Sequence, residues 1–220
     1  MKRVVFIALI LAVAIPIAYF IVNQANTPAL PFINPTDVQP EMVDSSVQHV
    51  GRNHKIGSFA LLDEQNQRIT DKVIEGKVFV AEYFFTTCGS ICPIMNEQMQ
   101  RVQERFKGDK AFQILSFTVD PEHDGPKELL AYATKHSYQP GQWHFVTGKK
   151  KDLYSLARTS FFVLKPAEAE NLGDAGSDFI HTNNFVLVDQ DRHIRGYYDG
   201  TNPSEVDQLI LDIEKLLDSK

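Results

Sequence analysis

The stretch KVFVAEYFFTTCGSICP, residues 77–93, holds both cysteines of the 220-residue chain, Cys88 and Cys92. The apolar run over 77–85 predicts a buried strand, and the hydrophobic spacing over 92–106 predicts a helix that ends before Gly108. The cysteines therefore lie at a strand-loop-helix corner, where their spacing lets both sulfurs face one point from the first turn of the helix. Such a pair is a redox couple, a metal site, or both.

Strands and helices alternate along the rest of the chain. Strands are expected over 59–62 and 68–70, joined as a hairpin, and over 112–119, 143–146, 185–188 and 193–198; helices are expected over 126–136, 150–158 and 204–217. Asp124 is the expected N-cap of the helix over 126–136. This order implies an α/β fold with a mixed sheet flanked by helices, similar to a thioredoxin-like fold, with the first hairpin as an extension.

The N-terminus begins with Lys2 and Arg3, followed over 4–22 by an uncharged apolar run that is long enough to cross a bilayer. A cleaved signal peptide is the alternative, but the run lacks a well-placed small-residue cleavage site. The two basic residues predict that the chain beyond the run is exported. We therefore expect a transmembrane anchor over 1–22, a proline-containing tether over 23–55 and a domain over 56–220, in a single-pass protein with its domain on the extracytoplasmic, periplasmic side.

Composition narrows the class of function. The chain has 43% hydrophobic residues, as an ordinary globular domain does, and its 22 basic residues against 28 acidic ones give a net charge of −6. A nucleic-acid-binding protein needs a basic patch, so we expect no nucleic-acid partner. In an exported protein, a pair of thiols can also be oxidised.

The chemistry of the cysteines favours a soft metal or thiol exchange. A helix N-terminus lowers the pKa of a thiol in its first turn, and two sulfurs select Cu(I), Zn or Fe–S over Mg²⁺ and Ca²⁺. A structural zinc site needs four ligands and no further cysteine is present, whereas copper(I) accepts three. His181, before the strand over 185–188, is the first candidate for the third ligand, and His123 is its rival. A stabilising disulfide stays open, although so short a loop gains little from closure.

Three features together resemble the SCO/SenC family of membrane-anchored copper proteins: FFTTCGSICP over 84–93, SFTVDPEHDGP over 116–126, and a distal histidine before a strand. The resemblance covers residues 59–217 and implies a thioredoxin-like fold with copper bound by Cys88, Cys92 and His181. It also implies a metallochaperone that assists assembly of the CuA site in its partner, cytochrome c oxidase subunit II, or in another cuproprotein. Ile180 departs from the pattern, because family members often have aspartate before the histidine.

Three hypotheses follow. The first is a copper chaperone, carrying Cu(I), Cu(II) or both. The second is an enzyme, a thiol-disulfide reductase acting on exported proteins with Cys88 as nucleophile and Cys92 as resolving thiol. The third is an inert, membrane-anchored disulfide domain. Under the first hypothesis only the dithiol form takes up metal, so oxidation of the pair would switch the site off.

Overall fold

The computed structural model describes residues 14–16, 29–166, 179–181 and 183–219. Nearly all of the expected membrane anchor over 1–22 lies outside these residues. Within the described part of the chain, no helix has both the length and the apolar character that a membrane span requires.

A seven-stranded mixed sheet forms the centre of the domain, in the order β2-β1-β5-β4-β3-β8-β9. β3, β4 and β5 run parallel, while β1, β8 and β9 pair antiparallel with their neighbours. The strands are β1 (Ala60–Asp63), β2 (Arg68–Thr70), β3 (Val78–Phe84), β4 (Phe112–Thr118), β5 (Trp143–Thr147), β8 (Asn184–Val188) and β9 (Ile194–Asp199). A separate two-stranded sheet pairs β6 (Leu164–Pro166) with β7 (Phe179–His181). The predicted mixed sheet, with hairpin β1–β2 at one edge, is confirmed.

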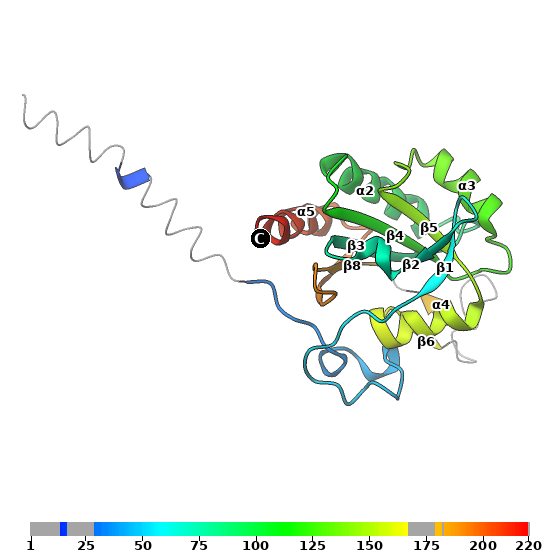
Figure 1. Ribbon diagram of the computed structural model, residues 1–220, viewed down its shortest axis with the longest axis horizontal. Helices are drawn as coiled ribbons and strands as arrows, with labels where there is room; N and C mark the ends of the chain where they lie inside the picture. Colours follow the sequence, from blue (N-terminus) through cyan, green and yellow to red (C-terminus); the bar gives the residue numbers. More distant parts are fainter. Residues whose placement is uncertain (1–13, 17–28, 167–178, 182, 220) are drawn as a thin grey trace, which may run out of the picture. The chain divides into compact units, whose positions relative to one another are not determined.

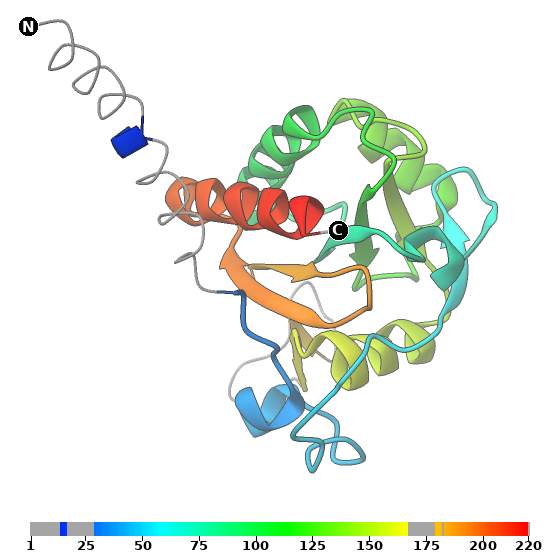
Figure 2. The same ribbon diagram turned by 60° about the vertical axis from the view of Figure 1, so that its left-hand side comes forward.

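Helices cover both faces of this sheet (Figures 1 and 2). α2 (Ile91–Arg105), α3 (Pro126–Lys135) and α5 (Pro203–Asp218) lie on one face; α4 (Lys150–Leu156), which continues as a π-helical turn (Ala157–Phe161), lies on the other. Every residue of β3 and β4 is consequently buried, which explains why apolar residues do not simply alternate with polar ones in these strands. The polar exceptions, Glu82, Gln113, Ser116 and Thr118, are buried as well.

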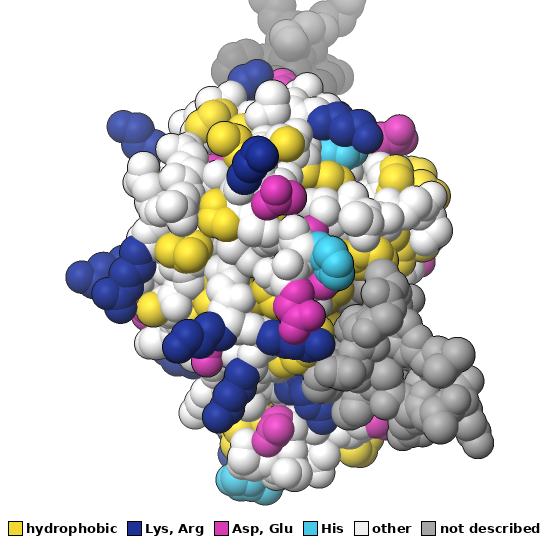
Figure 3. All heavy atoms as spheres, turned by 90° about the vertical axis from the view of Figure 1, so that its right-hand side faces the viewer, with side chains coloured by type: hydrophobic (Ala, Val, Ile, Leu, Met, Phe, Trp, Pro, Cys, Tyr) yellow, Lys and Arg dark blue, Asp and Glu magenta, His cyan; other side chains and the backbone are white. Residues whose placement is uncertain are grey.

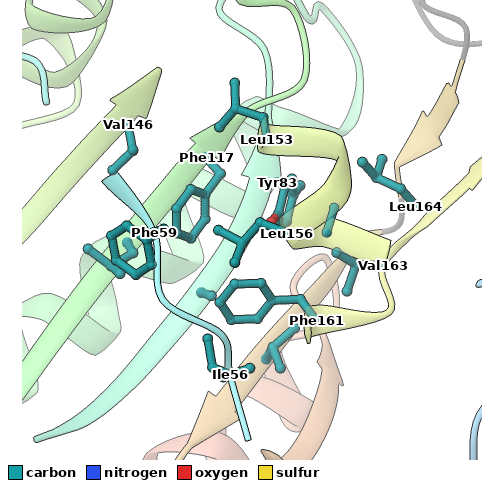
Figure 4. Packing of buried hydrophobic residues seen from close by; sticks show 14 of the residues in the cluster. Ile56, Phe59, Tyr83, Phe117, Val146, Leu153, Leu156, Phe161, Val163 and Leu164 are labelled. Carbon is teal, nitrogen blue, oxygen red and sulfur yellow. The ribbon is translucent and has the colours of Figure 1, made fainter. Parts of the chain in front are cut away.

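Aromatic side chains fill the space between the sheet and α4 (Figure 4). The Tyr83 ring stacks on Phe117 with centroids 5.3 Å apart, and Phe161 lies 5.5 Å from Phe117. Phe59 meets Phe117 edge-on from the hairpin side. These contacts join the ends of β3 and β4 to α4 and the turn that follows it. The end of β3, from which the cysteine loop starts, is therefore held rigidly by packing.

Residues 31–55 fold onto the domain instead of forming the expected tether. The compact unit spans Pro31–Lys220. Met42 and Val43 are buried in its core, and Arg158 donates from Nη1 to the Glu41 carbonyl at 3.1 Å. Within this segment the described residues form two short 3₁₀ turns, and the second turn and the residue after it bury Met42 and Val43. Proline content alone therefore did not distinguish a tether from an ordered arm.

Charged side chains of both signs lie on the face of the molecule that Figure 3 shows. On the face shown in Figure 3, lysine and arginine side chains are interspersed with acidic, apolar and uncharged ones. Although acidic residues outnumber basic ones in the sequence, positive and negative side chains are mixed on this face.

Candidate metal centre

The two cysteines lie where β3 ends and α2 begins. Cys92 is the second residue of α2 and fully buried, whereas Cys88 lies in the loop ahead of the helix and is half-buried. The Cys88 Sγ accepts the backbone N–H of Cys92 at 3.5 Å and lies 3.7 Å from the Ser90 hydroxyl oxygen. Both cysteines are free thiols. The predicted strand-loop-helix corner is confirmed.

The two thiols differ in acidity. Burial raises the pKa of Cys88, but the Cys92 thiol, the N–H groups of Cys92 and Ser90 and the Ser90 hydroxyl outweigh burial and lower it. Burial raises the pKa of Cys92 strongly, and the neighbouring Cys88 and Glu82 add to this increase. The expected lowering of the pKa of a thiol in the first helical turn therefore fails for Cys92, whereas the lowered pKa of Cys88 agrees with its expected role as nucleophile. Cys88, placed just ahead of the helix, receives the N–H groups, while Cys92 inside the first turn loses water.

Asp124 holds the loop that carries Cys88. Its fully buried carboxylate accepts hydrogen bonds from the Thr86 N–H at 3.1 Å and the Thr118 hydroxyl at 2.5 Å, and from the Thr86 hydroxyl. The expected role of Asp124 as N-cap was wrong, because Gly125 occupies the N-cap position of α3. The carboxylate instead fastens the start of the cysteine loop to the end of β4.

A buried glutamate lies behind Cys92. Glu82 accepts a 2.6 Å hydrogen bond from the Ser116 hydroxyl, whose oxygen in turn accepts the indole N–H of Trp143 at 2.8 Å. Burial raises the pKa of Glu82 to about 7, since one hydroxyl does not replace the lost water. On the helix side, Asn96 donates to the Cys92 carbonyl at 2.8 Å and to the Tyr132 hydroxyl oxygen at 2.5 Å.

The two candidate histidines lie in different surroundings. The His123 side chain is 73% exposed and its Nδ1 lies 2.9 Å from Asp120, which raises the His123 pKa. The backbone of His181 ends β7, where it pairs with Leu164, but its side chain lies outside the described residues. Ala81 of β3 pairs with Val186 of β8, which runs antiparallel to β3. The first residues of β8 therefore lie at the same end of the sheet as the last residues of β3, from which the cysteine loop starts.

Sequence reasoning missed Glu82 and a cluster of Asp63, Glu64 and His144, and it gave Asp124 the wrong role. A signal for Glu82 was present, because it is a lone charge within the apolar run of β3. Asp124 gave no separate signal, since an acid two residues before a helical proline is usual in turns.

The chain matches the family described as SCO1/SenC over residues 47–218. It is 30% identical over 164 residues to the SCO1 protein homolog of Bacillus subtilis, covering 74% of this chain and 82% of that protein. It is 26% identical over 171 residues to a putative copper-binding protein of Stutzerimonas stutzeri, covering 77% and 80% respectively.

A solved structure agrees with this assignment. BsSco, described as a member of the Sco family of cytochrome c oxidase assembly proteins and as containing a disulfide switch, superposes with a TM-score of 0.64. It is 28% identical, and the match covers 76% of this chain and 96% of that one. The fold, the matched residues and the paired cysteines lead to one conclusion: this chain belongs to the SCO1/SenC family and has its thioredoxin-like fold.

Proposed function

We propose that this protein is a copper chaperone, in which Cys88, Cys92 and His181 bind one copper ion as cargo and pass it to a cuproprotein. The observation that carries the proposal is the pair of free thiols at the corner between β3 and α2, in a chain of the SCO1/SenC family. Two sulfurs and one imidazole form a soft donor set that suits copper.

The topology supports His181 as the third ligand. The segment that follows His181 enters β8 at the end of the sheet where the cysteine loop leaves β3. His123, in contrast, extends into solvent beside Asp120. Thr86 and Asp124 fix the loop on one side, so a ligand from the β8 side would complete the set without rearranging the strands.

A copper titration of the reduced 220-residue chain tests this proposal. We expect one tightly bound copper and, in the Cu(II) form, a thiolate-to-copper charge-transfer band. His181→Ala should weaken binding by about 100-fold or more, while the matched control His123→Ala should leave it unchanged. Unchanged affinity in the His181→Ala variant would sink the three-ligand site.

The proposed acceptor is the CuA site of cytochrome c oxidase subunit II. BsSco is described as belonging to a family of oxidase assembly proteins, which supports this choice. A strain that carries Cys88→Ser in place of the native chain should lose CuA absorption from its oxidase, and added copper should restore part of it. Normal CuA content at limiting copper would contradict this role.

The apolar run over 4–22 supports a membrane anchor that keeps the domain on the extracytoplasmic side. Membrane fractions washed with high salt should retain the full chain. In intact spheroplasts, added protease should digest the domain. Recovery of the chain in the soluble fraction, or protection from protease, would contradict the proposed location.

The asymmetry of the thiols favours a second candidate function, thiol-disulfide reduction. Cys88, half-exposed and with a lowered pKa, would attack a partner disulfide and release one partner thiolate. Cys92 would then give up its proton to that thiolate, attack Cys88 in the mixed disulfide and release the second partner sulfur. Reduction of a dithiol partner that persists in the His181→Ala variant, together with negligible copper affinity, would favour this function over metal delivery.

A further inference from the structure

A second group of potential metal ligands lies away from the cysteines, where hairpin β1–β2 meets β5 (Figure 1). Asp63 ends β1 and pairs with Val146, which places the following Glu64 beside Phe145 and His144. One ligand atom from each of Asp63, Glu64 and His144 lies within 4.8 Å of the other two. His144 is in register with Leu115 of β4, two strands away from β3, so this cluster is separate from the cysteine loop.

Glu64 is the buried centre of the cluster. Its side chain is fully shielded from solvent, and its Oε2 accepts the N–H of Phe145 at 3.1 Å. Within the described part of the chain, its other oxygen, Oε1, has no hydrogen-bond partner, and neither has the buried Nδ1 of His144. That Nδ1 lies 3.7 Å from Oε2, too far for a good hydrogen bond. Two potential ligand atoms are thus buried without the partners that such atoms need.

Asp63 supplies a second, oriented carboxylate. It is 8% exposed, and its Oδ1 accepts the N–H groups of Gln65 at 3.0 Å and Gln67 at 2.8 Å, which fixes the carboxylate within the hairpin turn. Two carboxylates beside one imidazole leave an excess of negative charge, which a cation would balance.

We infer that Asp63, Glu64 and His144 bind one divalent cation of the Zn²⁺ class. One imidazole and two carboxylates are a usual set for zinc, whereas Mg²⁺ and Ca²⁺ prefer oxygen ligands alone. Zinc bonds of about 2.1 Å place neighbouring ligand atoms roughly 3.4 Å apart, close to the separation of His144 and Glu64 in the structure. Water completes the fourth position. The ion would fasten the hairpin turn to the first residues of β5, and so stabilise that edge of the sheet.

The test uses the full chain with Cys88→Ser and Cys92→Ser, so that zinc cannot bind to sulfur. Equilibrium dialysis against Zn²⁺ should give one bound ion, and Zn²⁺ should raise the melting temperature, because an ion that binds only the folded state stabilises it. On this background, His144→Gln should weaken zinc binding by about 100-fold and remove the thermal shift.

His193 provides a matched control. Its side chain is 15% exposed against 13% for His144, its buried Nδ1 also lacks a hydrogen-bond partner among the described residues, and a carboxylate, Asp189, lies 3.5 Å away. Arg195, however, already pairs with Asp189 at 2.8 Å and supplies the balancing charge. His193→Gln should therefore leave zinc binding unchanged.

Asp63→Asn covers the case in which His144→Gln does not fold. Its amide oxygen can keep the hydrogen bonds from Gln65 and Gln67, while the charge is lost, so we expect zinc binding to weaken by about tenfold or more. The inference is overturned if the parent variant binds no zinc, or if Asp63→Asn and His144→Gln bind it as the parent does; the cluster is then only an internal ion pair. None of these outcomes depends on copper binding at Cys88 and Cys92.

Discussion

Two buried glutamates, Glu82 near the cysteines and Glu64 at the hairpin, are each 1% exposed, but their pKa values shift in opposite directions. Burial raises the pKa of Glu82 to about 7, and only the Ser116 hydroxyl opposes it. Burial has the same effect on Glu64, but the His144 imidazole and two backbone N–H groups, those of Glu64 itself and Phe145, reverse it. Burial alone therefore does not set the charge of a buried acid; its partners do.

The two regions consequently differ in the ions that they suit. Around Cys92, burial raises the pKa of Glu82 to about 7, so this carboxyl carries less negative charge at neutral pH than an exposed one, and the soft thiols select the metal. At the hairpin, ionised oxygens and an imidazole favour a harder cation. One sheet thus supports two kinds of ligand set at different positions.

The largest expected effect is the loss of copper when one sulfur is removed. Cys92→Ser should lower copper affinity by about 1,000-fold or more, roughly 4 kcal/mol, because a hydroxyl is a poor ligand for a soft metal. Competition with a copper chelator measures it. Glu64→Gln is the control at the other region and should stay within about threefold of the native affinity; an equal loss there would mean that the regions are not independent.

The next effect concerns stability and pH. Because the pKa of Glu82 is raised from 4.5 to about 7, its contribution to stability is complete below the unfolded value and is lost as the pH rises through about 7. Glu82→Gln should therefore be up to about 3 kcal/mol more stable than the native protein at pH 8 and similar to it at pH 4.5.

Urea unfolding of the reduced, metal-free Glu82→Gln variant and native protein across this pH range measures the difference in stability.

The stability of Glu64→Gln should change with pH in the opposite way. The lowered pKa of Glu64 in the native protein contributes stability that is present above the unfolded pKa and is lost as the pH falls through the folded pKa. Glu64→Gln should therefore be less stable than the native protein at neutral pH, and the difference should shrink at low pH. Parallel pH profiles for the two variants would contradict the comparison.

A smaller effect is expected at Asp124. Asp124→Asn removes one of the two acceptor oxygens that hold Thr86 and Thr118, so the cysteine loop should loosen and copper affinity should fall by about 10- to 100-fold. The charge-transfer band should also shift, which a general loss of stability would not produce. Asp212→Asn changes a buried acid of α5 that accepts the Tyr198 hydroxyl; it is the control and should leave the band unchanged.

The smallest effect is expected from His144→Gln when copper is measured. Affinity and charge-transfer band should match those of the native protein within about twofold, because His144 lies two strands away from β3. A changed band would show that His144 reaches the sulfur site.

Much of the architecture could be predicted because it depends on local patterns. The apolar runs of β3 and β4, the helical spacing after Cys92 and the polar turn between β1 and β2 are short-range signals, and the structure confirms each element to within a few residues. The arm over 31–55 could not be predicted in the same way, since its few apolar residues become informative only when the surface that they cover is known.

The sequence by itself determined the α/β fold, the cysteine corner and the family, because spacing and residue type carry those signals. Tertiary structure alone decided which thiol is the more acidic, because burial of Cys92 and the N–H groups around Cys88 depend on where α2 packs. It also decided that Asp124 reaches Thr86, 38 residues earlier, and that β1–β5 pairing gathers Asp63, Glu64 and His144. Strand order is a long-range property, and charges that meet through it leave no pattern along the chain.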